Sequence, residues 1–286
     1  MILFIIGNGF DIGNGMQTRY KHFYHFLKNN HEDFFKTVAS LFLADFETDP
    51  FWCDFEECLA DFTPEYFIDQ KLSPQQTSET TLGFQELLCQ YFKEWICSIA
   101  LPQSNSLSSC TSDAFFINFN YTDTLEKIYN VPSDKVLHIH GQASQPKSKL
   151  IIGHSSKATI DDMCKSYRII KNDSIECTHE ELNYLIVAEM LLFTLKKPTD
   201  EIIQHKLQPI DFQQVSEIAV LGHSLGNVDW PYFKFIKEHL TQSVHWNFSA
   251  YCERDREQIL LFVKAFQITD YSIDSLQNLI SQYSPN

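Results

Sequence analysis

The chain has 286 residues, of which 44% are hydrophobic, and this composition suits one large domain or one domain with an insertion. The formal net charge of −15 argues against a broad nucleic-acid-binding face, because duplex binding depends on neutralising phosphates with Lys and Arg. No apolar run approaches the roughly 18–20 residues of a membrane-spanning helix, and the 8 cysteines contain no C-x-x-C pair. We therefore expect a cytoplasmic protein with reduced thiols.

The first segment of the chain predicts a strand followed by a glycine-rich turn. The apolar run over residues 1–6 indicates a short buried strand that ends at Gly7-Asn8-Gly9, and a helix is expected from about Thr18. Glycines let a backbone approach a phosphate, and the following helix offers free N–H groups. Because the strand begins at residue 1, we expect no signal peptide.

The match of this turn to a dinucleotide-binding fingerprint is partial. In the pattern G-x-G-x-x-G the third glycine is replaced by Ile12, and Gly13 comes one position late. Asp11 lies inside the turn, where its carboxylate would repel phosphate but could accept hydrogen bonds from a ribose. The alternative is a tight strand–helix turn that binds no ligand.

Most of the next hundred residues have the apolar period of helices. We expect helical structure over 18–47, again over 52–59, and in a strongly amphipathic helix over 82–99, followed by a Ser-rich loop at 104–112. Residues 156–206 are also predicted to be helical. The chain is thus interpreted as one α/β domain, 1–286, with helical insertions at about 18–112 and 156–210.

Further short apolar runs predict the remaining strands. They cover residues 114–120, 136–139, 150–154, 217–221 and 244–252. Helices are expected after Thr122 or Asp123, either of which can cap one, and at Asp229-Trp230-Pro231. Strands that alternate with helices predict a parallel, Rossmann-like sheet.

Polar, glycine-containing sequence follows four of these strands. The four segments are 7–11, 120–123, 138–141 and 222–229. In an open parallel sheet the carboxyl ends of the strands line one crevice, where ligands bind. We therefore expect these segments to converge, although ordinary loop chemistry would also explain each of them.

His138 and His140 alternate along a strand, which predicts two imidazoles on one face. That spacing suits a metal ion, but a third ligand is needed and only His154 offers one, so no metal site is predicted. His140, before a glycine at the strand end, is suited to general-base work because imidazole titrates near neutrality. His138 is interpreted as a core histidine.

Asn120 ends an apolar strand, and its amide could hold a substrate hydroxyl or position a water molecule. A helix-entry turn would explain the same residue equally well.

Residues 222–226, Gly-His-Ser-Leu-Gly, match the nucleophile elbow G-x-S-x-G. That fold needs an acid and then a histidine after the serine, and only His239 and His245 follow. A helix must also begin directly at Ser224, whereas Asn227 to Pro231 indicates a loop. The serine-hydrolase interpretation is therefore rejected.

Taken together, the motifs resemble the AbiH family of bacterial abortive-infection proteins. The matching pieces are Ile5-Ile6-Gly7-Asn8-Gly9-Phe10-Asp11, then Gly15 with Thr18, Tyr20 and Phe23, Trp52-x-x-Phe55-Glu56-x-x-Leu59, Phe119 to Glu126, His138-Ile139-His140-Gly141, Ile152-Gly153-His154, and Leu221 to Phe233. They span nearly the whole chain. The resemblance implies a role in bacteriophage resistance.

The same order of motifs resembles, more distantly, the sirtuin-like NAD-binding fold of several defence NAD hydrolases. Carried over, this resemblance implies that His140 is the general base and that Asn120 orients the attacking water or the ribose. The nucleotide-binding set it implies consists of Gly7, Asn8, Gly9, Asp11, Gly222, Ser224 and Asp229. The Asn-x-Asp of that fold is replaced by Asn120-Tyr121-Thr122, with Asp123 one position late.

The expected function is hydrolysis of NAD⁺ at the nicotinamide–ribose bond during infection, with NAD⁺ as substrate and no bound cofactor. The four-cysteine zinc module of the deacetylases is absent from the sequence, which argues against protein deacetylation. The alternative is a nucleotide-binding sensor or scaffold without catalysis of its own, and homo-oligomerisation is compatible with either. A nuclease is a third option, weakened by the acidic charge and the lack of clustered carboxylates. The trigger is expected to derive from the phage.

Overall fold

The computed structural model describes residues 1–60, 74–102, 113–155 and 191–284. The chain divides into two compact units. Residues 1–19, 93–151 and 198–286 form the first, which we call the sheet unit, and residues 20–92 and 152–197 form the second, the helical unit. The Ser-rich loop at 104–112, and residues 156–190 of the segment expected to be helical over 156–206, lie outside the described residues.

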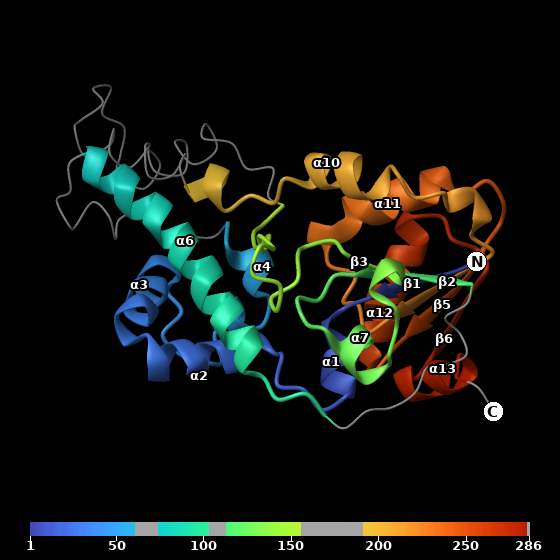
Figure 1. Ribbon diagram of the computed structural model, residues 1–286, viewed down its shortest axis with the longest axis horizontal. Helices are drawn as coiled ribbons and strands as arrows, with labels where there is room; N and C mark the ends of the chain where they lie inside the picture. The colour runs from blue at the N-terminus through green and yellow to red at the C-terminus, as the bar shows by residue number, and fades with distance from the viewer. Residues whose placement is uncertain (61–73, 103–112, 156–190, 285–286) are drawn as a thin grey trace. The chain divides into compact units, whose positions relative to one another are not determined.

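The sheet unit is built on a six-stranded sheet with the order β3-β2-β1-β4-β5-β6, and every neighbouring pair is parallel (Figure 1). The strands are β1 Ile2–Ile6, β2 Ala114–Asn118, β3 Val136–His138, β4 Glu217–Leu221, β5 His245–Ser249 and β6 Tyr271–Asp274. This is the strand order of dinucleotide-binding sheets, in which successive strands are added toward one edge from β1 to β3 and toward the other edge from β4 to β6. The predicted Rossmann-like α/β fold is confirmed.

Strand β1 shows why these sequences read as unbroken apolar runs. Leu3 and Ile5 belong to one buried core, whereas Phe4 and Ile6 belong to another. Successive side chains of a strand point to opposite faces, so the two cores lie on the two faces of the sheet. A sheet covered on both faces requires apolar residues at every position of a central strand.

Helices cover each face. Trp230–His239 (α11) and Glu253–Ala265 (α12) contribute to the core of Leu3, and Asn8–Gly13 (α1), Thr124–Ile128 (α7) and Leu276–Gln282 (α13) contribute to the core of Phe4. The shorter elements of this unit are α10 Thr199–Ile202, η2 Ser133–Lys135, η3 Ile203–Leu207, η4 Phe212–Gln214 and η5 Asn227–Asp229. Asp123 occupies the N-cap position of α7, and Pro231 lies in the first turn of α11, as the sequence predicts.

The described part of the helical unit is held together by aromatic side chains. Its elements are α2 Tyr20–Asn30, α3 Glu32–Phe42, η1 Pro50–Trp52, α4 Phe55–Cys58 and α6 Pro74–Ser98, of which α6 continues beyond the unit at residue 93. The ring of Phe23 packs edge-on against Phe55 and Phe92, at centroid distances of 5.8 and 5.2 Å. The apolar stripes of these helices are therefore core.

The elements differ from the expectations in three places. The helix expected from about Thr18 is α2, which begins at Tyr20, but a short helix that was not expected, α1, precedes it directly behind the turn and is anchored by the fully buried Phe10. Residues 150–154 form no strand of the sheet. There His154 makes an isolated bridge with Lys196, and a Cβ on Gly153 would lie 2.2 Å from the Leu195 carbonyl oxygen. Strand β6, finally, lies in a region where the sequence predicts none.

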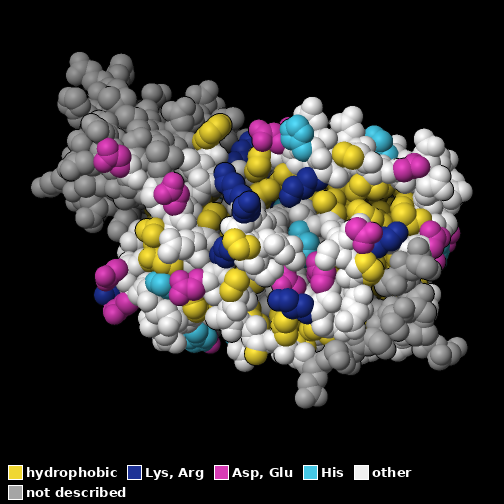
Figure 2. Space-filling model, in the orientation of Figure 1, with side chains coloured by type: hydrophobic (Ala, Val, Ile, Leu, Met, Phe, Trp, Pro, Cys, Tyr) yellow, Lys and Arg dark blue, Asp and Glu magenta, His cyan; other side chains and the backbone are white. Residues whose placement is uncertain are grey.

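The face of the molecule in Figure 2 carries both signs of charge. Acidic side chains, basic side chains and histidines are interspersed there with apolar ones. Within the described ranges, every helix is too short or too polar to cross a bilayer.

Candidate functional site

Four neighbouring strands end in one row across the sheet. Ile6 pairs with Asn118 on one side and with Leu221 on the other, and Asn118 pairs with His138. In a parallel sheet this register brings the carboxyl ends of β1, β2, β3 and β4 to the same edge. The four polar segments therefore leave the sheet side by side, on both sides of the switch point between β1 and β4.

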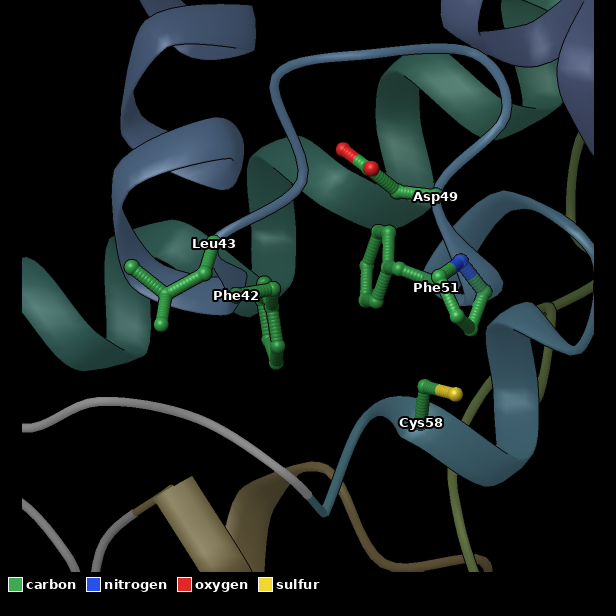
Figure 3. Close-up of a pocket in the computed structure, with 6 residues that line it drawn as sticks. Phe42, Leu43, Asp49, Phe51 and Cys58 are labelled. Atoms are coloured by element: carbon green, nitrogen blue, oxygen red, sulfur yellow. The ribbon is translucent and has the colours of Figure 1, made fainter.

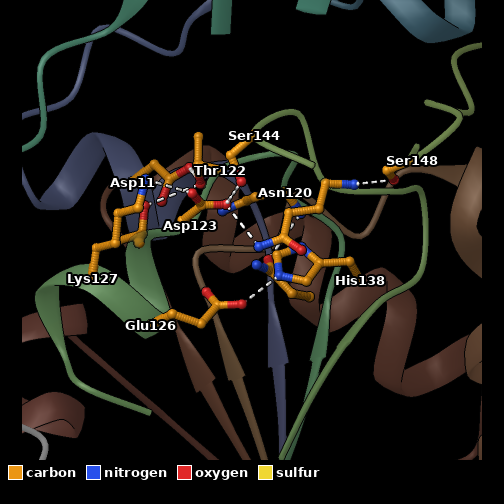
Figure 4. Close-up of polar contacts among 12 residues, drawn as sticks. Asp11, Asn120, Thr122, Asp123, Glu126, Lys127, His138, Ser144 and Ser148 are labelled. Atoms are coloured by element: carbon orange, nitrogen blue, oxygen red, sulfur yellow. Dashed lines mark hydrogen bonds and ion pairs between the residues drawn. The ribbon is translucent and has the colours of Figure 1, made fainter. Parts of the chain in front are cut away.

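Asp11, in α1, is a buried carboxyl group at this edge, with 1% of its surface exposed. Its Oδ2 accepts a hydrogen bond of 2.6 Å from the Thr122 hydroxyl (Figure 4). Among the described residues, none donates to its Oδ1. Burial raises the pKa of Asp11 to about 6, against the opposing effect of hydrogen bonds from Thr122, Thr124 and Asn120. Asp11 can therefore exchange a proton near neutral pH.

Asn120 joins the ends of β1 and β2. Its side-chain NH₂ donates to the Gly7 carbonyl over 3.0 Å, and its backbone N–H donates to the side-chain oxygen of Asn118 over the same distance. Neither of these contacts uses the amide oxygen of Asn120. The residue is buried, and it fixes the turn after β1 relative to the end of β2.

His140 and His223 face one carboxylate. The Nε2 atom of His140 lies 4.0 Å from Oδ1 of Asp229, and Nε2 of His223 lies 3.4 Å from Oδ2. The ring of Phe119 meets both imidazoles edge-on, at centroid distances of 5.3 and 4.6 Å. The structure thus brings together two predicted site residues, His140 and Asp229, and adds the imidazole of His223 to them.

His223 is the member of this candidate site that the sequence analysis did not select. It stands at a variable position of the G-x-S-x-G pattern, which directs attention to the serine. A signal was present nonetheless, because the residue directly follows Gly222 at a strand end and precedes an acidic helix-entry position, Asp229.

His138 has partners of its own. Its Nε2 lies 2.7 Å from Oε1 of Glu126 in α7 (Figure 4), and Lys206 donates to the backbone carbonyls of His138 and Ile139. Strand β3 ends at His138, so the alternation that would place His138 and His140 on one face does not continue to His140. Burial lowers the pKa of Lys206.

Asp123 is the centre of a separate polar cluster (Figure 4). Its carboxylate accepts hydrogen bonds of 2.8 Å from Gln142 and Ser144 and forms an ion pair of 2.8 Å with Lys127. Burial acts to raise the pKa of Asp123, but the Lys127, Gln142 and Ser144 contacts together outweigh it, so the pKa is lowered. A carboxylate held in this way is ionised at neutral pH and organises the loop after β3.

His154 belongs to the helical unit. Its backbone N–H donates to the Leu195 carbonyl, and its side chain is buried. Burial, with a smaller effect of Lys196, lowers its pKa to about 4, so the imidazole is neutral at physiological pH. Among the described residues, no group of three or more His, Cys, Asp or Glu side chains is arranged to hold a metal ion.

The glycines of the predicted nucleotide-binding set allow two backbone segments to touch. A Cβ on Gly7 would lie 2.4 Å from Cα of His223, and one on Gly222, whose φ is +66°, would lie 2.0 Å from the Phe10 nitrogen. The N–H of Gly7 donates to the Leu221 carbonyl, and that of Gly9 donates to Gly222. These two amides are thus engaged within the protein, and a phosphate would need other donors.

Asn8 and Ser224, also in the predicted nucleotide-binding set, lie next to these glycines in the two turns. The Asn8 side chain donates to the Thr18 carbonyl over 2.8 Å, and Ser224 is exposed. No helix begins at Ser224, since the chain continues without regular structure to η5 at Asn227. The predicted loop between Ser224 and the helix at Trp230 is thus present.

A pocket of about 220 Å³ lies elsewhere, in the helical unit (Figure 3). The rings of Phe42 and Phe51 stack at its wall with a centroid distance of 4.6 Å, and Asp49 and Cys58 also line it. None of the predicted site residues contributes to this pocket. Its lining offers few polar groups, so the sheet edge remains the stronger candidate for chemistry.

Comparisons with known proteins agree with the sequence motifs. The family model described as bacteriophage abortive infection AbiH matches residues 3–250, which include every predicted site residue. Searches of the curated proteins and of the solved structures found no match. Because the family model covers most of the chain, including the whole row of strand ends and its polar segments, the protein belongs to the AbiH family of bacteriophage abortive infection proteins.

Proposed function

We propose that this protein acts in phage abortive infection by hydrolysing NAD⁺ at the bond between nicotinamide and ribose. Family membership supports the abortive-infection role. The observation that supports the chemistry is the approach of His140 to Asp229, 4.0 Å apart, at the carboxyl edge of a sheet with dinucleotide-binding strand order. Asn120 follows the neighbouring strand β2 at the same edge.

The reaction needs few groups. Nicotinamide leaves with the electrons of the glycosidic bond, the ribose carbon passes through an oxocarbenium-like state, and water adds to that carbon. His140 would take the proton of the water, and the negative charge of Asp229 would stabilise the developing cation. In a buried site these electrostatic effects are stronger than in water.

A nucleotide-binding sensor is the second candidate, and the burial of His140 favours it. Only 2% of His140 is exposed, so water has little access to the imidazole in this conformation. Catalysis would require the segments after β3 and β4 to open, whereas a sensor could use the same opening to report a bound nucleotide.

Nicotinamide release from NAD⁺ by protein purified from phage-infected cells tests the proposal. We expect His140→Ala to lower kcat by about 10²–10⁴-fold, the range for loss of a general base, and Asn120→Ala to lower it as well. His239→Ala is the matched control, because His239 is an exposed histidine of the same unit. Protection of infected cells without any loss of NAD⁺ contradicts the proposal. Thermal protection by NAD⁺ without release of nicotinamide supports the sensor.

A further inference from the structure

The loop that follows β4 fixes the tautomer of His223. The backbone N–H of Leu225 donates to Nδ1 of His223 over 2.9 Å. A backbone N–H can only donate, so Nδ1 must accept with its lone pair, and the proton of the neutral imidazole resides on Nε2. Nε2 is the atom that faces Asp229.

The backbone of Leu225 is strained, and several contacts hold it in place. Its φ of +56° is in the left-handed region, which a residue with a side chain rarely adopts. The side chain is buried, and the Leu225 carbonyl accepts hydrogen bonds from Trp230 Nε1 over 2.9 Å and from Gln258 Nε2 over 3.1 Å. Strain that is fixed by surrounding contacts in this way is characteristic of functional segments.

The two imidazoles lie nearest to different carboxylate oxygens of Asp229. His223 lies 3.4 Å from Oδ2, and His140 lies 4.0 Å from Oδ1. The distance to His140 is longer than a hydrogen bond, as is common for catalytic contacts in unliganded sites, which shorten when substrate binds. The ring of Phe119 packs at close to a right angle against both imidazoles and restrains them beside this carboxylate.

We propose that His223 is a positioning residue, locked with its proton on Nε2, that donates to Asp229 and thereby turns the other carboxylate oxygen toward His140. This inference rests on the proposed function in so far as it concerns catalysis. The tautomer of His223 is a property of the folded chain and does not depend on the reaction.

The tautomer is measured by long-range ¹H–¹⁵N correlation NMR on the full chain labelled at histidine. The His223 resonances are identified by their loss in His223→Gln. We expect the neutral imidazole of His223 to show an unprotonated Nδ1 and a protonated Nε2. The opposite tautomer, or a rapidly exchanging mixture, overturns the inference whether or not the protein cleaves NAD⁺.

Two substitutions separate positioning from packing. His223→Gln keeps an N–H donor near the position of Nε2, whereas His223→Leu fills the same space without one. We expect Leu to lower kcat by roughly 10–100-fold, the size of effect seen when orienting partners of functional histidines are removed, with KM little changed. Gln should restore most of that loss. Equal activity of both variants, with equal melting temperatures, refutes the positioning role.

If the wild-type protein releases no nicotinamide while His223 shows the expected tautomer, the proposed function fails and the structural half of the inference stands. If nicotinamide is released and the tautomer is wrong, the proposed function stands and the inference fails. The two results are therefore distinguishable.

Discussion

Asp11 and Asp123 both lie in segments that follow strands at the carboxyl edge of the sheet, yet their surroundings move their pKa values in opposite directions. Burial dominates at Asp11 and raises the pKa to about 6. At Asp123 burial also acts to raise the pKa, but the contacts with Lys127, Gln142 and Ser144 prevail and lower it. One carboxyl group therefore favours its protonated form in the folded state, and the other favours its charged form.

We expect Asp11→Asn to stabilise the protein at pH 8. The pKa of Asp11 rises from 3.8 to about 6 on folding, so the folded state binds more protons between these pH values. Stability of the wild type therefore falls as pH rises from about 4 to about 6, and the shift corresponds to about 3 kcal/mol. Urea denaturation of both proteins at pH 4 and pH 8 measures this difference, which should be larger at pH 8.

Asp123→Asn is the matched contrast. A pKa lowered by folding contributes stability above the unfolded value of 3.8, and this contribution is lost as pH falls below it. The substitution should therefore destabilise the protein at pH 8, by about 1–2 kcal/mol for weakened charged hydrogen bonds, and have less effect in acid. If both variants shift stability in the same direction at pH 8, the assignment of opposite causes is wrong.

At the scale of elements, the turns after β1 and β4 hold each other in place through glycine. Gly222→Ala would add a left-handed alanine whose Cβ lies 2.0 Å from a backbone nitrogen, so the two turns must separate. We expect a loss of roughly 3–5 kcal/mol, because strain and a backbone clash act together. Thermal and urea unfolding measure it.

Gly15→Ala is the control for this prediction. Gly15 also has a positive φ, of +84°, but no atom lies within 4 Å of the position that an alanine Cβ would occupy there. Only the conformational cost, about 1–2 kcal/mol, should remain. Equal losses in the two variants would show that close contact between the turns contributes nothing.

Elements with a strong local pattern were predictable, and those set by distant contacts were not. The strand over 217–221 is covered on both faces, and the unbroken apolar run over 218–221 indicates this in the sequence. Tyr271–Asp274 (β6) pairs only with β5, at the edge of the sheet, and its mixed polar sequence lacks such a run. The convergence of the strand ends followed from the alternation of strands and helices. The approach of His223 to Asp229 was not predictable, because it occurs in a loop where Leu225 has a positive φ and donates to His223, and no sequence pattern indicates either feature.

At the scale of the whole molecule, the helical unit is assembled from two stretches of chain, 20–92 and 152–197. A buried ion pair connects them. The ammonium group of Lys197 lies 2.9 Å from Oε2 of Glu56, and the lysine side chain has no exposed surface. A buried charge that loses its partner is costly, so this pair reports on the joining of the two stretches.

We expect Glu56→Gln to destabilise the helical unit by about 3–5 kcal/mol, because it leaves the Lys197 ammonium without its carboxylate. Hydrogen exchange of α2 and α3, followed by mass spectrometry, measures the change within that unit. Glu32→Gln removes a carboxylate from the exposed ion pair with Lys36, 2.8 Å long, and should change the exchange far less, because water solvates both charges. Similar exchange in both variants contradicts the prediction.

The pairing of β1 also determines when the sheet can form during synthesis. Ile2 pairs with Ala114 on one side and with Glu217 on the other, so the central strand is made long before either neighbour. At a translation rate of about 5–20 residues per second, roughly 10–40 s separate β1 from β4. Both edges of this apolar strand stay unpaired until β2 has been made, and one edge stays unpaired until β4 follows, so the nascent chain exposes a strand that chaperones can bind.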